Sequence, residues 1–519
     1  MTFFSPEFVL VFLAFLIVYW TLKNHIFAQK ILILLASYGF MCSINPRFAL
    51  VLAAYSAFVY FAGVCIARAN RVVTKAIPPA KQSSHKKKLS RKAAAKQMSA
   101  AKQAGIAKQV QKAGLARQLP LPTAKARAVM LAAVAGGLFF LAFFKYYGYV
   151  REFFNAALAA LHLGAVDSVA FPLGISYYVF MSITYFVSVY RRECCEQGFL
   201  SLACFLAFFP SVVMGPIGRA SAAKGVEPVL PQFDRFKHFG NADEIYVLII
   251  FALVKLLLIS GYLGAYYSDV ISGVYGDEPE SSAAQILAAL LLYGVVLYTN
   301  FSGFIDMARA LGLAMGFKLP QNFNMPYAAK SLGEFWDRWH ISLSTFIRDY
   351  IYIPLGGSRK GFTRTCVNLL IAFALSGIWH GAGLNFLIWG LLHGVALVFL
   401  KCLAKVGVKP LNPHLALFCT YIFVSFAWIF FANSLPDAAA ILGAFTRARA
   451  FGDISELAVL AVILAGIFVY PKISALKDTL IALFAELPFL PKALALGVIF
   501  TLLFALMPSG IPNFIYAGF

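Results

Sequence analysis

Residues 245–263 read IYVLIIFALVKLLLISGYL, an apolar run that carries a single charged side chain, Lys255. A helix needs about 17–25 mostly apolar residues to cross the hydrocarbon core of a bilayer, so this run is long enough to span a membrane. Only helices and closed barrels satisfy their backbone in lipid, and the run lacks strand alternation. Similar runs recur at residues 8–22, 49–67, 129–147, 283–298, 384–400, 415–431, 457–470 and 493–506.

These runs predict an all-α, polytopic transmembrane protein. With four shorter apolar segments they give about 11–13 membrane crossings or re-entrant helices. The composition agrees, because 61% of the 519 residues are hydrophobic and only 13% are charged. Soluble domains contain about 45–50% apolar and about 25% charged residues, so a soluble globular protein is excluded. The shorter segments are residues 31–44, 169–189, 200–214 and 367–379.

The net charge of +22 is concentrated in one stretch of the chain. Residues 68–127 contain 16 of the 44 Lys and Arg and none of the 22 Asp and Glu. This stretch is rich in Ala, Gln and Ser and cannot bury enough apolar surface to form a core, so we expect an exposed loop. The chain then divides into N-terminal transmembrane helices (1–67), a basic cytoplasmic loop (68–128) and a membrane core (129–519), with a motif region at 298–394 and a C-terminal tail at 508–519.

The basic loop predicts the orientation of the chain. Lys and Arg are retained on the cytoplasmic side, where they rest on anionic lipid headgroups, and this anchoring is the role we favour for the loop. Three crossings before the loop place the N-terminus on the outer face, and the lack of charge after Lys492 favours the same face for the C-terminus. Docking of an acyl-carrier protein on the loop is an open alternative. Nucleic-acid binding is not expected, because no folded reading module accompanies the charge.

Ionisable side chains appear inside apolar surroundings between residues 298 and 394. Such side chains are costly in lipid, so they are expected to face the bundle interior or a water-filled cavity and to mark function. His380 ends an apolar run, and a neutral buried histidine can act as a general base. His340 follows the aromatic and charged run at 335–339. A purely structural role is the alternative for both histidines, and no ligand spacing supports a metal site.

Several strings in this region form a specific pattern. They are residues 300–306 (NFSGFID), 335–344 (FWDRWHISLS), 348–357 (RDYIYIPLGG) and 377–381 (GIWHG), with earlier matches at 171–180, 208–210 and 215–219. Together they resemble the membrane-bound O-acyltransferase family. Within it, they are similar to the bacterial polysaccharide branch, which includes alginate and peptidoglycan O-acetyltransferases and the teichoic-acid D-alanyl transferase. The basic loop lies outside the resemblance.

The resemblance implies which residues form the site. His380 matches the essential histidine of the family and His340 its second characteristic histidine. Both would line a funnel where a cytoplasmic donor, acetyl-CoA or another acetyl donor, meets an acceptor from the outer face, without a metal. For Asp306 and Arg338, structural ion pairing is an equally good explanation. The residues expected to shape the site are Asp306, Trp336, Arg338, Trp339, Ser344, Arg348 and Trp379.

The chain ends in Phe-Ile-Tyr-Ala-Gly-Phe, with the tyrosine at Tyr516. The resemblance implies that a C-terminal motif of the Phe-Ile-Tyr type, on the chain itself or on a small partner, carries the acyl group on its tyrosine, which makes Tyr516 a candidate covalent carrier. A phenol with a pKa of about 10 is a weak nucleophile, and His380 would remove its proton during attack on a thioester. The alternative is a hydrophobic tail with Tyr516 as an interfacial anchor.

The sequence therefore predicts a multi-pass acyltransferase of the bacterial inner (cytoplasmic) membrane with both termini periplasmic. It would move an acetyl group across the membrane for O-acetylation of an exported or cell-wall polysaccharide of the alginate or peptidoglycan type. Its expected partners are membrane lipids and a periplasmic acetylesterase-fold transferase. Two alternatives stay open: D-alanyl transfer to teichoic acid, and a transporter of lipid-linked sugars, which would need inverted repeats that are not apparent.

Overall fold

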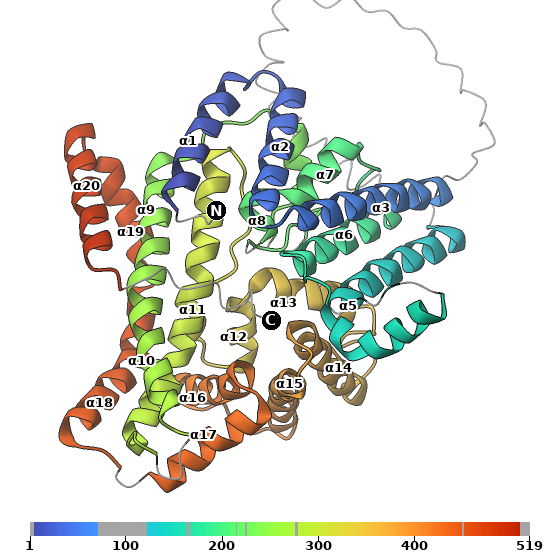
Figure 1. Cartoon of the computed structure of the whole chain (residues 1–519). Helices are drawn as coiled ribbons and strands as arrows, with labels where there is room; N and C mark the ends of the chain where they lie inside the picture. Colours follow the sequence, from blue (N-terminus) through green and yellow to red (C-terminus); the bar gives the residue numbers. More distant parts are fainter. Residues whose placement is uncertain are drawn as a thin grey trace, which may run out of the picture.

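The computed structural model of the chain is built of helices (Figure 1). Among the residues it describes, the only strand-type pairing is an isolated bridge between Ala223 and Val226. This confirms the predicted all-α class. Residues 71–121 of the basic loop, and the tail that contains Tyr516, lie outside the described residues. The structure describes residues 5–70, 122–161, 164, 166, 168–213, 215–223, 226–275, 279–448 and 451–508.

Nine helices or helix runs in the described part of the chain are long and apolar enough to cross a membrane, and three shorter apolar helices accompany them. Large apolar side chains cover their outer faces, as at Leu10, Phe139 and Val462, which suits contact with lipid tails. The nine spans are α2 (Ile26–Ile44), α3 (Pro46–Asn70), α5 (Ala124–Ala160), α9 to α10 (Ala242–Ser272), α11 (Ala283–Ala314), α14 (Phe362–His380), α15 (Leu384–Lys405), α16 (Pro413–Ala432) and α18 with η5 (Ile454–Ile473). The shorter ones are α1 (Pro6–Thr21), α6 (Ile175–Tyr190) and α20 (Phe489–Ala505).

Proline breaks two of the predicted apolar segments. The segment 169–189 becomes helical only at Ile175, after Pro172, and the segment 200–214 is divided near Pro210 because a proline disrupts a continuing helix.

The long Ala242–Ser272 run contains a π-helical stretch. Two of the nine spans are composite: one consists of α9 (Ala242–Leu253), η2 (Val254–Ser260) and α10 (Gly261–Ser272), and the other of α18 (Ile454–Val469) and η5 (Tyr470–Ile473). The remaining elements are α7 (Phe199–Ala207), α8 (Phe209–Val212), η1 (Leu230–Asp234), η3 (Pro326–Ala328), α12 (Leu332–Arg338), α13 (Ile341–Ile347), η4 (Arg348–Tyr352), α17 (Leu435–Arg447) and α19 (Leu476–Glu486).

Helix α11 is the most deeply buried span and runs through the middle of the fold. It packs against α9, α10, α16 and α18, while α19 and α20 lie on α9 at the edge of the molecule (Figure 1). On the other side, α3, α5 and α6 pack together. The short elements α12, α13 and η4 lie in the centre, next to the hairpin of α14 and α15. These short central elements carry the most specific sequence motifs.

Two glycines allow α14 and α15 to approach closely. A Cβ atom on Gly377 would lie 2.2 Å from the backbone oxygen of Phe386, and one on Gly390 would lie 2.3 Å from that of Phe373. Membrane helices use such small residues at tight interfaces, because lipid offers no hydrophobic force to press helices together. The contact therefore fixes the hairpin that carries His380 at the end of α14.

We expect Gly377→Ala to lower the thermal stability of the protein, because the added methyl group must push backbone away from backbone. Overpacking of this kind costs about 1–3 kcal/mol. The measurement is the midpoint of thermal unfolding in detergent. Gly497→Ala in α20 is the matched control, since nothing lies within 4 Å of its added Cβ. Equal midpoints for the two variants would contradict the close contact.

Candidate active site

His380 is the last residue of α14 and is 4% exposed. Three aromatic rings enclose its imidazole, at centroid distances of 4.6 Å for Trp379, 5.0 Å for Trp389 and 5.2 Å for Phe431. The rings belong to α14, α15 and α16, so three spans meet at this histidine. The imidazole is thus held in a defined place inside the helical core.

His340 lies at the turn between α12 and α13, with its backbone in the left-handed region at φ +43°. This region is uncommon for a residue with a Cβ, and such conformations cluster at functional sites. Asn322 holds the turn, because its carbonyl oxygen accepts from the N–H of Ile341 at 2.9 Å and its side-chain oxygen from that of Ser342 at 3.1 Å. The imidazole is 1% exposed and packs edge-on against Phe301, at 4.8 Å between centroids.

The indole of Trp379 connects the two histidines. Its centroid lies 4.6 Å from that of His380 and 6.4 Å from that of His340. Phe180 of α6 stacks on the same indole at 5.1 Å. The fold therefore brings both predicted histidines to one aromatic cluster.

A third histidine, His393 of α15, belongs to the same neighbourhood but has a structural environment. It is fully buried, and its Nδ1 accepts a hydrogen bond from the indole N–H of Trp336 at 3.3 Å. Its ring also contacts Trp389 at 5.3 Å. His393 thus positions the indole of Trp336.

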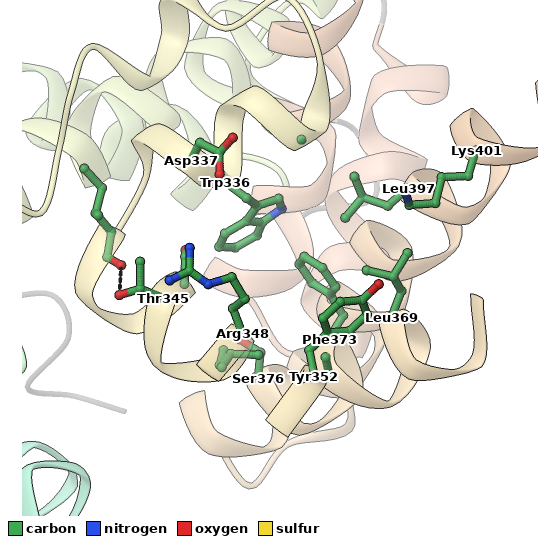
Figure 2. Close-up of a pocket in the computed structure, with 15 residues that line it drawn as sticks. Trp336, Asp337, Thr345, Arg348, Tyr352, Leu369, Phe373, Ser376, Leu397 and Lys401 are labelled. Carbon is green, nitrogen blue, oxygen red and sulfur yellow. Dashed lines mark hydrogen bonds between the residues drawn. The ribbon is translucent and has the colours of Figure 1, made fainter. Parts of the chain in front are cut away.

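A cavity of about 320 Å³ lies between the α12–η4 segment and the α14–α15 hairpin (Figure 2). Trp336, Phe373 and Ser376 are among its lining residues. Ser376 precedes His380 by one helical turn, so the two residues lie on the same face of α14. The cavity therefore reaches to within one turn of the histidine along α14.

Charged groups line the cavity as well. Arg348 of η4, Lys401 of α15 and Asp337 of α12 contribute to its wall. The Nε of Arg348 donates to Asp349 at 2.8 Å, and the other carboxylate oxygen of Asp349 lies 3.3 Å from a guanidinium nitrogen of the buried Arg219. Asp349 thus holds Arg348 in place, while Lys401 extends from the opposite wall.

The end of the α14–α15 hairpin that carries Lys401 is rich in basic residues. Arg359, Lys360 and Arg364 flank the start of α14, and Lys401 and Lys405 lie at the end of α15. The Nζ of Lys405 lies 4.3 Å from the ring centroid of Phe362, so the two helix ends are neighbours. One end of the hairpin therefore collects positive charge, and His380 lies at the other end.

The family of the chain follows from comparison with known proteins. A model of the membrane-bound O-acyltransferase family matches residues 186–431, which include both histidines and the cavity. The probable alginate O-acetylase AlgI of Pseudomonas putida is 35% identical over 343 residues, which cover 64% of this chain and 68% of that relative. The chain belongs to the membrane-bound O-acyltransferase family. This confirms the resemblance that its motifs carry.

Other relatives widen the range of acyl groups and acceptors. A peptidoglycan O-acetyltransferase of Helicobacter pylori is 33% identical over 360 residues, covering 62% of this chain and 65% of the relative. A teichoic acid D-alanyltransferase of Streptococcus thermophilus is 27% identical over 307 residues, covering 51% of this chain and 69% of the relative. The aligned parts thus span about two thirds of each relative.

Four of the site residues predicted from the sequence lie at the cavity or beside the two histidines. Trp336, Ser344 and Arg348 line the cavity, and Trp379 contacts both histidines. Within the part of the chain that the structure describes, no group of three or more His, Cys, Asp or Glu side chains could hold a metal ion. The buried histidines and the cations of the cavity offer acid–base and anion-binding chemistry to an O-acyltransferase.

Three other predicted residues do not line the cavity. Asp306 of α11 pairs with Lys255 at 2.6 Å. Arg338 pairs with Glu334 at 2.8 Å. For both residues the structure therefore matches the alternative of ion pairing. Trp339 is 1% exposed and packs on Trp428, at 5.0 Å between centroids, and Trp428 stacks in turn on Trp389, one of the rings around His380.

Sequence reasoning missed three cations near the site. Arg219 ends the matched string at 215–219, but no role was predicted for its charge. Lys401 directly follows the apolar run 384–400, near the end of α15. Lys145 is a charged residue inside the apolar run 129–147. The rule that charges inside membrane spans mark function would have selected Lys145, had it been applied beyond residues 298–394.

Proposed function

We propose that this O-acyltransferase takes an acetyl group from a cytoplasmic thioester donor and passes it across the bacterial inner membrane for O-acetylation of an exported or cell-wall polysaccharide. The observation that carries the proposal is the cavity beside α14, which lies at the basic end of the hairpin and is lined as far as Ser376, one helical turn before His380. The names of the relatives that act on alginate and peptidoglycan supply the acceptor class.

The distribution of charge supports the direction of transfer. Positively charged segments stay on the cytoplasmic side, so the start of α14, beside Arg359 and Arg364, would face the cytoplasm. A helix of 19 residues rises about 28 Å, which is close to the thickness of the hydrocarbon core. His380 would then lie toward the outer face, where an acceptor arrives. The same rule, applied to the basic loop, would place the N-terminus in the periplasm, and the lack of charge after Lys492 favours the same side for the C-terminus.

In the proposed reaction His380 is the general base. It removes the proton from an attacking hydroxyl group, whose oxygen forms a bond to the acetyl carbonyl carbon of the donor. The C–S bond then breaks, and the leaving thiolate takes up the proton that His380 had accepted. His340 and Trp379 would position or polarise the reacting groups, since both lie in the ring cluster around His380.

The first acceptor is proposed to be the phenol of Tyr516. An aryl ester on this tyrosine has a good leaving group, so the acetyl group stays transferable on the outer face, where no acetyl-CoA exists. A periplasmic transferase of the acetylesterase fold would complete delivery to the sugar. The competing proposal is D-alanyl transfer from a carrier protein docked on the basic loop, and the name of the Streptococcus relative favours it as the second candidate.

The test uses the full chain in proteoliposomes, supplied in turn with labelled acetyl-CoA and with a D-alanyl-loaded carrier protein. We expect the labelled acetyl group to pass from acetyl-CoA to the protein, and the D-alanyl group to stay on the carrier protein. Transfer to the protein from the carrier alone would contradict the acetyl proposal and support D-alanyl transfer. No labelling from either donor, with protein that unfolds cooperatively, would contradict both.

We expect Arg348→Gln and Lys401→Gln each to raise the KM for a phosphate-bearing donor about tenfold, with kcat little changed. Each change removes a charge that lines the cavity, and a hydrogen bond to a charged group contributes about 1.5–3 kcal/mol. The measurement is the initial rate of thioester cleavage against donor concentration. Lys409→Gln is the matched control, because Lys409 is exposed just beyond α15 and does not line the cavity. An unchanged KM in both cavity variants would show that the donor binds elsewhere.

A further inference from the structure

Lys145 occupies an unusual place for a lysine. It lies in the middle of α5, a membrane span, and is only partly exposed. A charge inside a membrane helix is costly and is retained when it has a function. Lys145 takes part in none of the ion pairs found among the described residues, and its Nζ lies 5.9 Å from the ring centroid of Trp379. Its partners are therefore of another kind.

Those partners are backbone carbonyl groups at the end of α14. The Nζ of Lys145 donates to the carbonyl oxygen of His380 at 2.8 Å and to that of Trp379. The next residue of α5, Tyr146, donates its hydroxyl proton to the carbonyl oxygen of Ile378 at 2.7 Å. Two consecutive residues of one span thus bind three consecutive carbonyls of another.

These contacts complete the C-terminal end of α14. The last four carbonyl groups of a helix have no partner within the helix, and in a membrane each must find one. The fourth, that of Gly377, accepts from the N–H of Gly381. A cation is also favourable at a helix C-terminus, because it opposes the negative end of the helix dipole. The charge of Lys145 is thus balanced by α14 itself.

We propose that Lys145 is a positioning residue for acetyl transfer: with Tyr146 it binds the C-terminal carbonyls of α14 and so fixes the backbone and ring of His380. Because Lys145 holds the carbonyl of the very residue that would act as base, its loss frays the last turn and moves the imidazole. This inference rests on the function proposed above, in which His380 is the base.

The test compares Lys145→Met, Lys145→Arg and Tyr146→Phe in the full chain. We expect Lys145→Met to lower kcat about 10–100-fold, since a displacement of about 1 Å can cost a factor of about 100, while the KM for the acetyl donor changes less than about twofold. Lys145→Arg keeps a cationic donor and should retain activity within about fivefold of wild type. Tyr146→Phe loses one neutral hydrogen bond and should cost up to about fivefold.

Hydrogen exchange provides a readout apart from activity. Peptides that cover the end of α14 should exchange faster in Lys145→Met, and to a smaller extent in Tyr146→Phe, than in wild type. Lys125→Met, at the exposed start of the same helix, is the matched control and should change neither exchange nor kcat. If Lys145→Met does not accumulate, the other two variants decide, because Tyr146→Phe with wild-type exchange would overturn the proposal.

The two proposals fail in different ways. An inactive His380→Ala protein beside a Lys145→Met protein with wild-type kcat would overturn only the role of Lys145. A Lys145→Met protein that loses turnover without faster exchange at the end of α14 would also overturn it. A His380→Ala protein with wild-type turnover would overturn the proposed function instead.

Discussion

Replacing His380 by alanine is expected to lower the rate of acetyl transfer about 10²–10⁴-fold, the range that a general base contributes. His380 lies one helical turn beyond Ser376, the last residue of α14 that lines the cavity, and no other described histidine combines this place with contact to Trp379 at 4.6 Å. The measurement is the initial rate of thioester cleavage in proteoliposomes at saturating donor. His414→Ala is the control, because His414 is exposed at the start of α16.

His393 offers a sharper comparison for the same experiment. Like His380 it is buried and contacts Trp389, but its Nδ1 accepts from Trp336. We therefore expect His393→Ala to lower stability and to affect donor binding through the displaced indole, while kcat falls far less than in His380→Ala. An equal loss of kcat in the two variants, with equal unfolding midpoints, would contradict the assignment of His380 as the base.

The second large effect is expected for Tyr516→Phe, which should reduce acetylation of the polysaccharide about 10²-fold or more. The change removes one oxygen atom, and without it the covalent relay has no nucleophile. Wild-type protein incubated with donor should carry an acetyl group on its C-terminal peptide, sensitive to hydroxylamine, and the variant should not. The measurement is mass spectrometry of that peptide and of the surface polysaccharide.

Tyr149→Phe is the matched control for this variant. It removes the same atom from a tyrosine that is 75% exposed on α5. Near-normal acetylation in Tyr516→Phe, at wild-type amounts of protein in the membrane, would refute the relay. The tail would then be an interfacial anchor, and the acetyl group would pass directly from the donor to an acceptor at His380.

The fold was largely predictable because each membrane span carries its own signal. Hydrophobic length locates a helix without knowledge of its neighbours, so the runs at 245–263 and 384–400 appear as helices in the structure. Helix ends were less predictable. The segment 169–189 contains Pro172 near its start, and only backbone geometry reveals that the helix begins at Ile175.

The candidate site was predictable in part. Motif residues such as Trp336 and Arg348 line the cavity, and the two histidines share contact with Trp379. Composition identified Asp306 as a costly charge but does not reveal its partner, and the structure gives it Lys255. Lys145 could have been selected as a charge inside a membrane span, but its role could not be predicted, because its partners are backbone carbonyls of a distant helix and backbone atoms leave no pattern in a sequence.

The most direct test of the account is the content of O-acetyl esters in the surface polysaccharide of cells that carry the wild-type chain, His380→Ala or His414→Ala, at equal amounts of protein in the membrane. We predict normal ester content for wild type and His414→Ala, and none above background for His380→Ala. Wild-type ester content in the His380→Ala cells would contradict the central claim that acetyl transfer takes place at His380.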